Sequence, residues 1–323
     1  MNKISGKVCK LAANLFTTKR LITAKLPIFL PFYHTVSDEK LPHILNYNYR
    51  NIQQFEAELD FYLENYEPIS LAELNAGNFT RKVFHPSFDD GLKECAEIIA
   101  PILLRKGVPA TFFINTAFAD NKELFHRYKT SLVLNELKRK TENQVLQFLH
   151  ENGISPENIL QTSIHKIKIL DEAASMLGID FSQFLNEQKP YMITNQILGL
   201  QKQGFSIGAH SNRHPEFWLI NSEQQKEEIR LSFDWLEKNI HPEIKAFAFP
   251  YTDSGVPKSV FEYLHREIGC DISFGTAGIK YDELHNHLQR YPAEQPGDFE
   301  ANLKAEIVYH FLRKPVGKTI VRH

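Results

Sequence analysis

Short apolar runs alternate with longer amphipathic segments along most of the chain. The apolar runs have the composition of buried strands and cover residues 27–36, 82–88, 109–115, 205–209, 245–250 and 271–274. Segments 51–65, 92–106, 222–239 and 257–268 instead repeat apolar residues at spacings of three and four, and Ser222 and Pro257 are suitable helix starts. Strands that alternate with helices predict an α/β fold with a mostly parallel sheet.

This alternation also predicts where functional residues lie. Repeated βα units form either a barrel or a doubly wound sheet, and in both the reactive side chains gather at the carboxyl ends of the strands. Between about residues 120 and 190 the pattern changes to helical stretches at 132–140, 142–150 and 164–177 without clear strands. We interpret this region as a helical insertion that could act as a lid. Without repeats or Pro/Gly linkers, the 323 residues favour a single domain, 1–323.

The net charge and the cysteine content indicate which binding partners and which cellular compartment to expect. A formal net charge of -2 gives no general attraction to nucleic acid, so DNA and RNA are not expected as ligands. The cysteines Cys9, Cys95 and Cys270 are odd in number, widely spaced and without a CxxC pair. They therefore predict reduced thiols, for which a cytoplasmic location is the default.

Residues 1–30 contain no unbroken apolar stretch of signal-peptide or membrane-spanning length, which predicts a soluble protein. Basic residues alternate with apolar ones in this segment. Two interpretations remain open: an amphipathic helix packed on the domain, or a helix that contacts an anionic membrane surface from the cytoplasmic side.

The first segment with candidate catalytic residues is Ser87-Phe88-Asp89-Asp90-Gly91, which ends an apolar strand. Neighbours on a strand point to opposite faces, so two adjacent carboxylates converge only where the strand ends and turns, which Gly91 permits. Alone, Asp-Asp-Gly at a strand end is more often a solvated turn, because Asp and Gly are common turn residues.

A second segment, Gly-Ala-His-Ser-Asn-Arg-His-Pro at 208–215, places His210 and His214 four residues apart after another strand. Pro215 disfavours a helix at His214, so a turn is expected. Together with one Asp of the first segment, the two imidazoles form a three-ligand metal site with an open position for water, and the other Asp is free to act as a base. A third strand ends in Phe-Ala-Phe-Pro-Tyr at 247–251, and a main-chain N–H just after it could donate to an oxyanion.

The order SFDDG, AHSNRH and FAFPY resembles the NodB-type polysaccharide deacetylases, the fourth carbohydrate esterase family. The resemblance covers most of the chain and is weakest at 120–190. It implies a distorted, seven-stranded TIM-like (β/α) barrel and a hydrolase that removes N-acetyl or other N-acyl groups from an amino sugar in a polysaccharide, oligosaccharide or glycolipid. The residues then implied are Asp89 as general base, Asp90, His210 and His214 as metal ligands, and the Tyr251 N–H as oxyanion donor. Zinc is the first choice of metal, with cobalt, nickel or manganese as alternatives.

Two further positions follow from departures from the family pattern. Many relatives carry the acid histidine in a C-terminal Leu-His motif, whereas here Tyr33-His34 resembles the N-terminal motif of the exopolysaccharide branch, so His34 is the candidate general acid. It could also be a hydrogen-bonded core histidine. Ala248 stands where many relatives have an Arg that contacts the base. Arg290 could replace that guanidinium, although a lone Arg at a strand end could equally form a surface ion pair.

Three other residues, His85, Asp253 and Trp218, could line the cleft. Two alternative functions remain open from the sequence: an allantoinase-like or cyclic-imide hydrolase that acts on a small amide, and a catalytically silent glycan-binding module. Retention of both Asp and both His residues argues against the silent module.

Overall fold

The computed structural model describes residues 9, 17–140 and 142–323. At its centre, parallel strands form one curved sheet with the order β10-β8-β7-β6-β5-β4-β1-β11. The bounds of these strands are β1 Pro31–Tyr33, β4 Ser87–Phe88, β5 Thr111–Ile114, β6 Ser206–Ala209, β7 Ala246–Ala248, β8 Ile272–Gly275, β10 His287–Gln289 and β11 Tyr291–Pro292.

The two edge strands of this sheet are consecutive in the chain, since only Arg290 separates β10 from β11. β10 pairs with β8 and β11 pairs with β1, so the single segment 287–292 brings the two edges of the sheet together. The sheet is therefore a nearly closed barrel built from seven chain segments, the last of which is divided into two strands at Arg290. The predicted TIM-like (β/α) barrel is confirmed.

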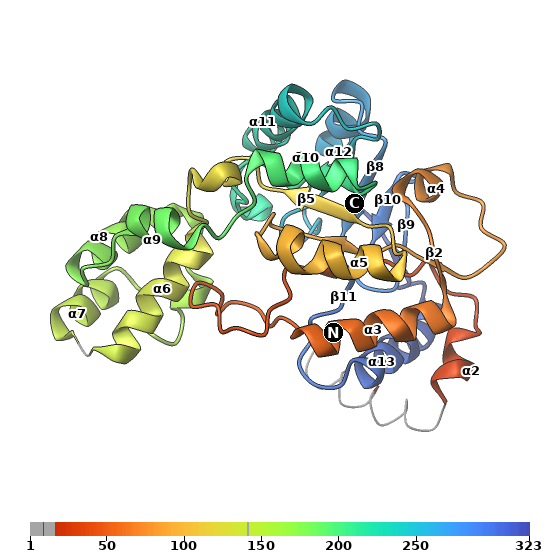
Figure 1. Cartoon of the computed structure of the whole chain (residues 1–323), viewed down its shortest axis with the longest axis horizontal. Coiled ribbons are helices and arrows are strands. Elements are labelled where there is room, and N and C mark those ends of the chain that lie inside the picture. Colours follow the sequence, from red (N-terminus) through yellow and green to blue (C-terminus); the bar gives the residue numbers. More distant parts are fainter. Residues whose placement is uncertain (1–8, 10–16, 141) are drawn as a thin grey trace.

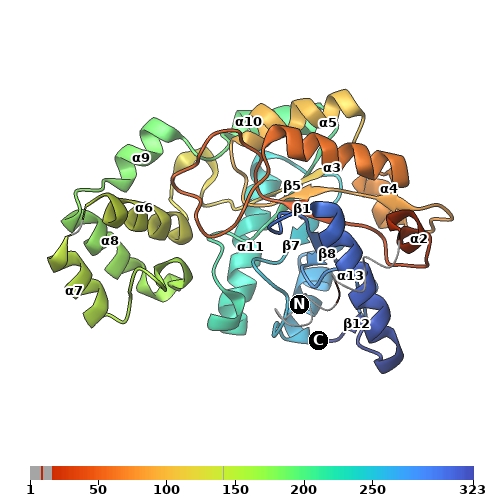
Figure 2. The same cartoon turned by 90° about the horizontal axis from the view of Figure 1, so that it is seen from below.

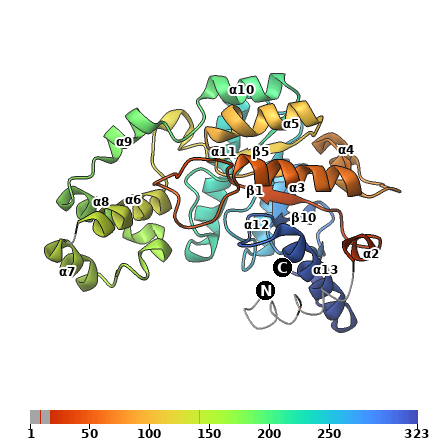
Figure 3. The same ribbon diagram turned by 60° about the horizontal axis from the view of Figure 1, so that its bottom comes forward.

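The helices around the barrel follow the amphipathic segments of the sequence (Figures 1 and 3). Two of them begin at capping boxes, in which Asn51 and Asn221 accept from the main chain of the third helical residue. The outer helices are α3 Ile52–Asn65, η1 Cys95–Ile99 continued by α5 Ala100–Lys106, α10 Thr194–Lys202, α11 Ser222–Asn239, α12 Lys258–Glu262 continued by η6 Tyr263–Glu267, and α13 Phe299–Arg313.

The predicted helical insertion lies between β5 and β6 and extends from one side of the barrel (Figures 1 and 2). Its helices bury a hydrophobic cluster of their own, separate from the barrel core, with Leu149, Ile159 and Leu170 fully buried. Its elements are η2 Ala119–Asn121, α6 His126–Arg139, α7 Asn143–Glu151, η3 Ile159–Gln161, η4 Ile164–Lys166, α8 Ile167–Met176 and α9 Phe181–Gln188.

Smaller elements complete the fold. Two short parallel pairs flank the barrel, β2 Glu67–Pro68 with β3 Val83–Phe84, and β9 Tyr281–Asp282 with β12 Ile320–Val321. The remaining helical segments are α2 Thr18–Ile22, α4 Leu71–Ala76, η5 Phe217–Leu219 and η7 Lys314–Val316.

Aromatic packing holds neighbouring barrel strands together. The Phe88 ring stacks on Tyr33 of β1, with centroids 5.7 Å apart, and on Phe112 of β5 at 5.2 Å. All three side chains are fully buried, and burial of a side chain of this size stabilises a fold by about 1.5–3 kcal/mol. Because Phe88 immediately precedes Asp89, this packing fixes the end of β4 relative to its neighbours.

Half of the predicted amphipathic segment at 1–30 lies outside the described residues, which include Cys9 and the residues from 17 onward. The described part contains α2, which packs against α13. Within the described chain, no helix combines the length and apolar character needed to cross a membrane. Cys9, Cys95 and Cys270 are all buried and free, in agreement with reduced thiols.

Candidate active site

The side chains selected from the sequence meet at the carboxyl ends of the barrel strands. His34 follows β1, Asp89 and Asp90 follow β4, and His210 follows β6. They line a cavity of about 370 Å³ together with residues of the insertion. The cavity wall consists of Phe32, His34, Asn46, Tyr47, Asp89, Asp90, Phe125, Arg127, Leu160, Gln161, His210, His214, Tyr251 and Thr276.

Asp90, His210 and His214 are close enough to share one metal ion, with candidate ligand atoms all within 4.8 Å of one another. Asp90 Oδ1 lies 3.4 Å from His214 Nε2 and 3.7 Å from His210 Nε2. In the described part of the chain, the buried Asp90 Oδ1 has no hydrogen-bond partner. His210 Nδ1 donates to the Ala248 carbonyl oxygen at 2.7 Å, so its Nε2 presents a lone pair to Asp90.

Burial lowers the pKa of His210, and it lowers the pKa of His214 further. Both imidazoles are therefore neutral at pH 7, as metal ligands must be. The other oxygen of Asp90, Oδ2, accepts from Tyr128 of α6 at 3.2 Å and from Tyr47 at 3.4 Å. Two nitrogen donors, one carboxylate and an orphaned buried oxygen fit a divalent cation such as zinc.

The turns that carry these groups adopt backbone conformations that residues other than glycine rarely take. Asp90, Ser211, His214 and Tyr251 have φ values of 71°, 64°, 53° and 56°. Each left-handed residue of this kind costs about 1–3 kcal/mol and persists only where its surroundings enforce it. The concentration of four of them at one end of the barrel is typical of a functional site. The turn predicted at His214 is present.

Asp89 is held by Arg290 in a buried two-point ion pair. Arg290 Nη1 donates to Asp89 Oδ1 at 2.7 Å and Nη2 donates to Oδ2 at 2.8 Å, while Nη1 also reaches Ser87 Oγ at 3.0 Å. Burial alone would raise the pKa of Asp89, but the Arg290 charge outweighs it and holds the pKa below its usual range. The contact expected of Arg290 is thus present, and the guanidinium is not on the surface.

His34 is fixed by Glu294, a residue that the sequence analysis did not select. His34 Nδ1 lies 2.6 Å from Glu294 Oε2, and Glu294 Oε1 accepts from the main-chain N–H groups of His34 and Thr35. The ring stacks on Tyr47 with centroids 4.2 Å apart. Burial disfavours the imidazolium, but Glu294 overcomes this and raises the pKa of His34 to about 9. Glu294 follows β11, so the carboxyl-end rule applied to that strand could have identified it.

Tyr251 borders the same cavity, with its ring 4.5 Å from that of His214. In the described chain its main-chain N–H makes no hydrogen bond, so this donor is available to a ligand. Arg127 Nε donates to Tyr251 Oη at 3.2 Å, and Arg127 Nη2 donates to the buried Glu216 at 2.8 Å. Glu216 lies two residues after His214. Arg127 therefore joins helix α6 of the insertion to two loops of the site, one by an ion pair with Glu216 and the other by a hydrogen bond to Tyr251. The sequence did not indicate this connection.

The remaining cleft candidates lie elsewhere. His85 is buried at the amino end of β4, where its ring bonds to Ile69 O and Thr111 Oγ1. Asp253 is buried beside His287 and Gln289 rather than in the cavity. Trp218 is 48% exposed and borders Tyr251 at 5.5 Å between ring centroids, outside the cavity wall. None of the three lines the cavity, so the expectation for His85, Asp253 and Trp218 was wrong.

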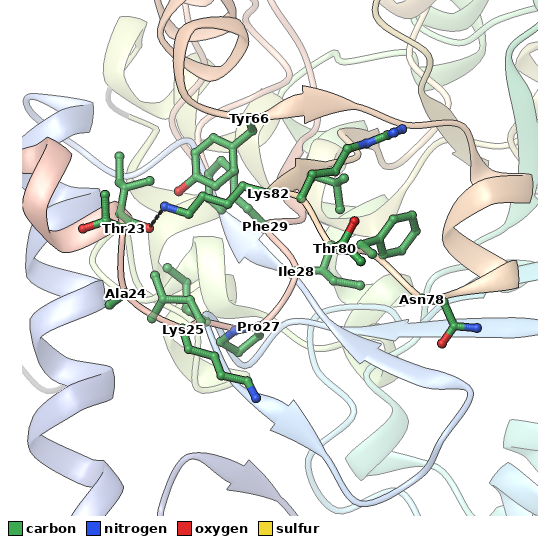
Figure 4. A pocket seen from close by; sticks show the side chains of 16 residues that line it. Thr23, Ala24, Lys25, Pro27, Ile28, Phe29, Tyr66, Asn78, Thr80 and Lys82 are labelled. Atoms are coloured by element: carbon green, nitrogen blue, oxygen red, sulfur yellow. Dashed lines mark hydrogen bonds between the residues drawn. The ribbon is translucent and has the colours of Figure 1, made fainter.

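A second cavity, of about 450 Å³, lies at the amino ends of the strands (Figure 4). Its walls come from segments that precede β1 and β3, and Lys82 Nζ, which lines it, donates to the Ile22 carbonyl oxygen at 2.6 Å. None of the metal-binding candidates borders it. The smaller cavity is therefore the candidate active site.

Comparison with known proteins gives a consistent result. A family model described as polysaccharide deacetylase matches residues 76–160 and 165–266, together more than half of the chain. A comparison with curated protein sequences gives no match.

Solved structures with a similar fold include the Streptococcus pyogenes deacetylase PplD in complex with acetate, with a TM-score of 0.57, 15% identity, and coverage of 88% of this chain and 99% of that one. IcaB from Ammonifex degensii has a TM-score of 0.57, 15% identity, and coverage of 87% and 98%. A de-N-acetylase from Aggregatibacter actinomycetemcomitans has a TM-score of 0.53, 14% identity, and coverage of 85% and 97%.

Proposed function

The chain belongs to the polysaccharide deacetylase family, and from this premise we propose that it uses a divalent metal ion to remove N-acetyl groups from an amino sugar of a glycan or glycolipid. One observation carries the proposal. An ionised, Arg-paired carboxylate lies next to a separate Asp-His-His set of metal-ligand type in one cavity. Hydrolysis of an amide needs both a base and an electrophile, and these two groups can provide them.

Asp90, His210 and His214 would hold the ion, which when bound would polarise the acyl carbonyl and lower the pKa of a water molecule. Zinc is the metal that this donor set favours, because two neutral imidazoles and one carboxylate are typical ligands of catalytic zinc. The hydrogen bond that Asp90 Oδ2 accepts and the one that His210 Nδ1 donates support the proposal, since they leave Asp90 Oδ1 and His210 Nε2 directed toward the shared position.

Asp89 would act as the general base and take a proton from the attacking water. Its ion pair with Arg290 keeps it ionised and correctly oriented at neutral pH. The water oxygen bonds to the acyl carbon, and the carbonyl oxygen becomes negatively charged. The Tyr251 main-chain N–H would donate to this oxyanion, because it makes no other hydrogen bond in the described chain.

His34 would then protonate the leaving nitrogen as the C–N bond breaks, which gives acetate and a free amine. Its raised pKa means that it carries the necessary proton at pH 7. Glu294 binds Nδ1, so Nε2 is the nitrogen that can reach the substrate. The pair resembles other acid–base histidines in that a carboxylate fixes the ring and stabilises its charged form.

Aromatic groups on the cavity wall support a sugar as the substrate. Tyr47, Phe125 and Tyr251 border the cavity, and aromatic faces pack well against the apolar faces of sugar rings. Phe125, Arg127 and Leu160 bring the insertion into the wall, so we expect this lobe to determine which glycan is accepted.

The test is acetate release from N-acetylglucosamine oligomers by the purified protein, before and after chelation, with small cyclic imides assayed in parallel. We expect acetate release that is lost on chelation and restored by zinc. If the protein opens the cyclic imide but releases no acetate, its substrate is a small amide and not a glycan. Absence of both activities in metal-loaded protein would favour the silent binding module.

A further inference from the structure

A second cluster of metal-ligand side chains lies outside the catalytic cavity. It contains Asp253 from the loop after β7, Asp282 at the end of β9, His287 at the start of β10 and His323 after β12. Their side chains are only 0–2% exposed, and one ligand atom of each lies within 4.8 Å of the others. Four segments that are distant in the sequence thus bring two carboxylates and two imidazoles to one buried point.

The separations of the ligand atoms suit a tetrahedral ion. His287 Nε2 lies 3.1 Å from Asp253 Oδ2, and His323 Nε2 lies 3.1 Å from Asp282 Oδ2 and 3.9 Å from Asp253 Oδ2. Ligands at zinc–nitrogen and zinc–oxygen distances of about 2.0–2.2 Å are about 3.4 Å apart in a tetrahedron. Little movement is therefore needed to admit the ion.

Surrounding groups orient the ligands in the manner of an outer coordination shell. The other nitrogen of His287, Nδ1, lies 2.7 Å from the buried Ser273 Oγ, and the other oxygen of Asp282, Oδ1, accepts from the Leu284 N–H at 2.9 Å. Gln289 Nε2 donates to both ligand oxygens, at 2.6 Å to Asp253 and 2.8 Å to Asp282. Such contacts fix the ring and carboxylate orientations that a metal site requires.

Gly275 provides the space for this arrangement. A Cβ at this position would lie 2.5 Å from Asp253 Oδ2 and from Gln289 Oε1, which is closer than atoms can pack. Its φ is not in the left-handed region, so the need for glycine comes from the close approach of the cluster and not from the backbone.

The charge of the cluster also calls for a cation. Two carboxylates are buried together, and among the described residues neither forms an ion pair with a Lys or Arg. A buried carboxylate is costly unless it is paired or coordinates a metal. The compensating positive charge must therefore come from protons on the two imidazoles or from a metal ion.

We propose that Asp253, Asp282, His287 and His323 form a second metal site, a closed structural zinc site. Four protein ligands complete a tetrahedron and leave no position for water, which distinguishes it from a catalytic site. The ion would fasten the segment after β12 to the loop that carries Tyr251, because Asp253 lies two residues after Tyr251. It would thereby stabilise the motif at 247–251 from the side away from the catalytic cavity.

The experiment is a zinc titration of the chelator-stripped full chain, followed by measurement of zinc per chain and of Tm. We expect two zinc ions per chain in the wild type, one in His214→Ala, one in His323→Gln and two in the control His285→Gln, which changes an exposed histidine of the same segment. Zinc should raise the Tm of His214→Ala, because that variant retains the structural site.

Failure of this proposal is distinguishable from failure of the proposed function. If only the catalytic assignment is wrong, the wild type binds one zinc, His214→Ala also binds one, and His323→Gln binds none. Unchanged zinc content in both His323→Gln and Asp282→Asn would overturn the structural site. So would His214→Ala protein that binds no zinc, a result that does not depend on the folding of the cluster variants.

Discussion

The ion pair between Arg290 and Asp89 makes the most specific prediction about the base. Arg290→Met removes the guanidinium but keeps much of the side-chain volume, and it leaves the Asp89 carboxylate buried with no counter-charge at 2.7–2.8 Å. Arg290→Lys serves as the matched variant, because it retains the charge and loses the two-point geometry.

The structure sets the size of the effect. The Arg290 and Asp89 side chains are 1% and 3% exposed, so solvent does not screen the pair. Removal of one partner of a buried pair costs about 3–5 kcal/mol of unfolding free energy, a large part of the about 5–15 kcal/mol of a typical domain. The double variant Asp89→Asn with Arg290→Met removes both charges and should recover most of that loss, but no activity.

The pH dependence gives an independent readout. In the wild type the pKa of Asp89 is below its usual value, so the pair stabilises the fold above about pH 4, the range where an unfolded Asp is ionised, and this contribution is lost as the pH falls through the folded pKa. In Arg290→Met the largest charge that opposes the effect of burial is gone, so the pKa of Asp89 rises. The acid limb of the activity profile should therefore move to higher pH.

Denaturant unfolding in the presence of a chelator measures the stability change without a contribution from metal binding, and acetate release across pH measures the activity limb. A loss below about 1 kcal/mol in Arg290→Met, together with an unchanged acid limb, would refute the reasoning. That result would mean that the guanidinium does not control the charge of Asp89.

Two further predictions concern the other side of the cavity. Glu294→Gln removes the charge that raises the pKa of His34 to about 9, so the alkaline limb of the kcat–pH profile should move to lower pH; an unmoved limb would exclude His34 as the acid. Arg127→Gln frees the Tyr251 ring and breaks the pair with Glu216, so kcat should fall about 10–100-fold at unchanged metal content. Tyr251→Phe keeps the main-chain N–H, so its kcat should fall less than about tenfold. An equal loss of kcat in Arg127→Gln and Tyr251→Phe would mean that Tyr251 acts through its phenol hydroxyl and not through its main-chain N–H.

Most of the barrel could be predicted because its signals are local. The strands that end at Phe88, Ala209 and Ala248 appear as apolar runs, and the polar residues after them lie at the carboxyl ends as the fold requires. His85 shows the limit of this logic. The sequence indicates one strand over 82–88, whereas the structure divides it into β3 and β4, which leaves His85 at the amino end of β4.

The contacts that tune the site could be predicted only in part, because they join distant parts of the chain. Arg290 was a candidate for Asp89 because the third motif lacks its usual arginine. Glu294 lies 260 residues from His34, and its place after β11 marks it as a candidate for the site without identifying His34 as its partner. The Arg127–Glu216 pair joins helix α6 of the insertion to the loop that follows His214. Such pairs depend on how the lobe meets the barrel, and no hydrophobic period encodes that geometry.

The measurement that tests the central claim most directly is acetate release from N-acetylglucosamine oligomers by the wild type and Asp89→Asn, each with its bound metal determined. The account predicts chelator-sensitive acetate release by the wild type, and an Asp89→Asn variant that retains metal while its rate falls by about 10²–10⁴-fold. A variant with wild-type activity, or a fully metal-loaded wild type that releases no acetate, would contradict it.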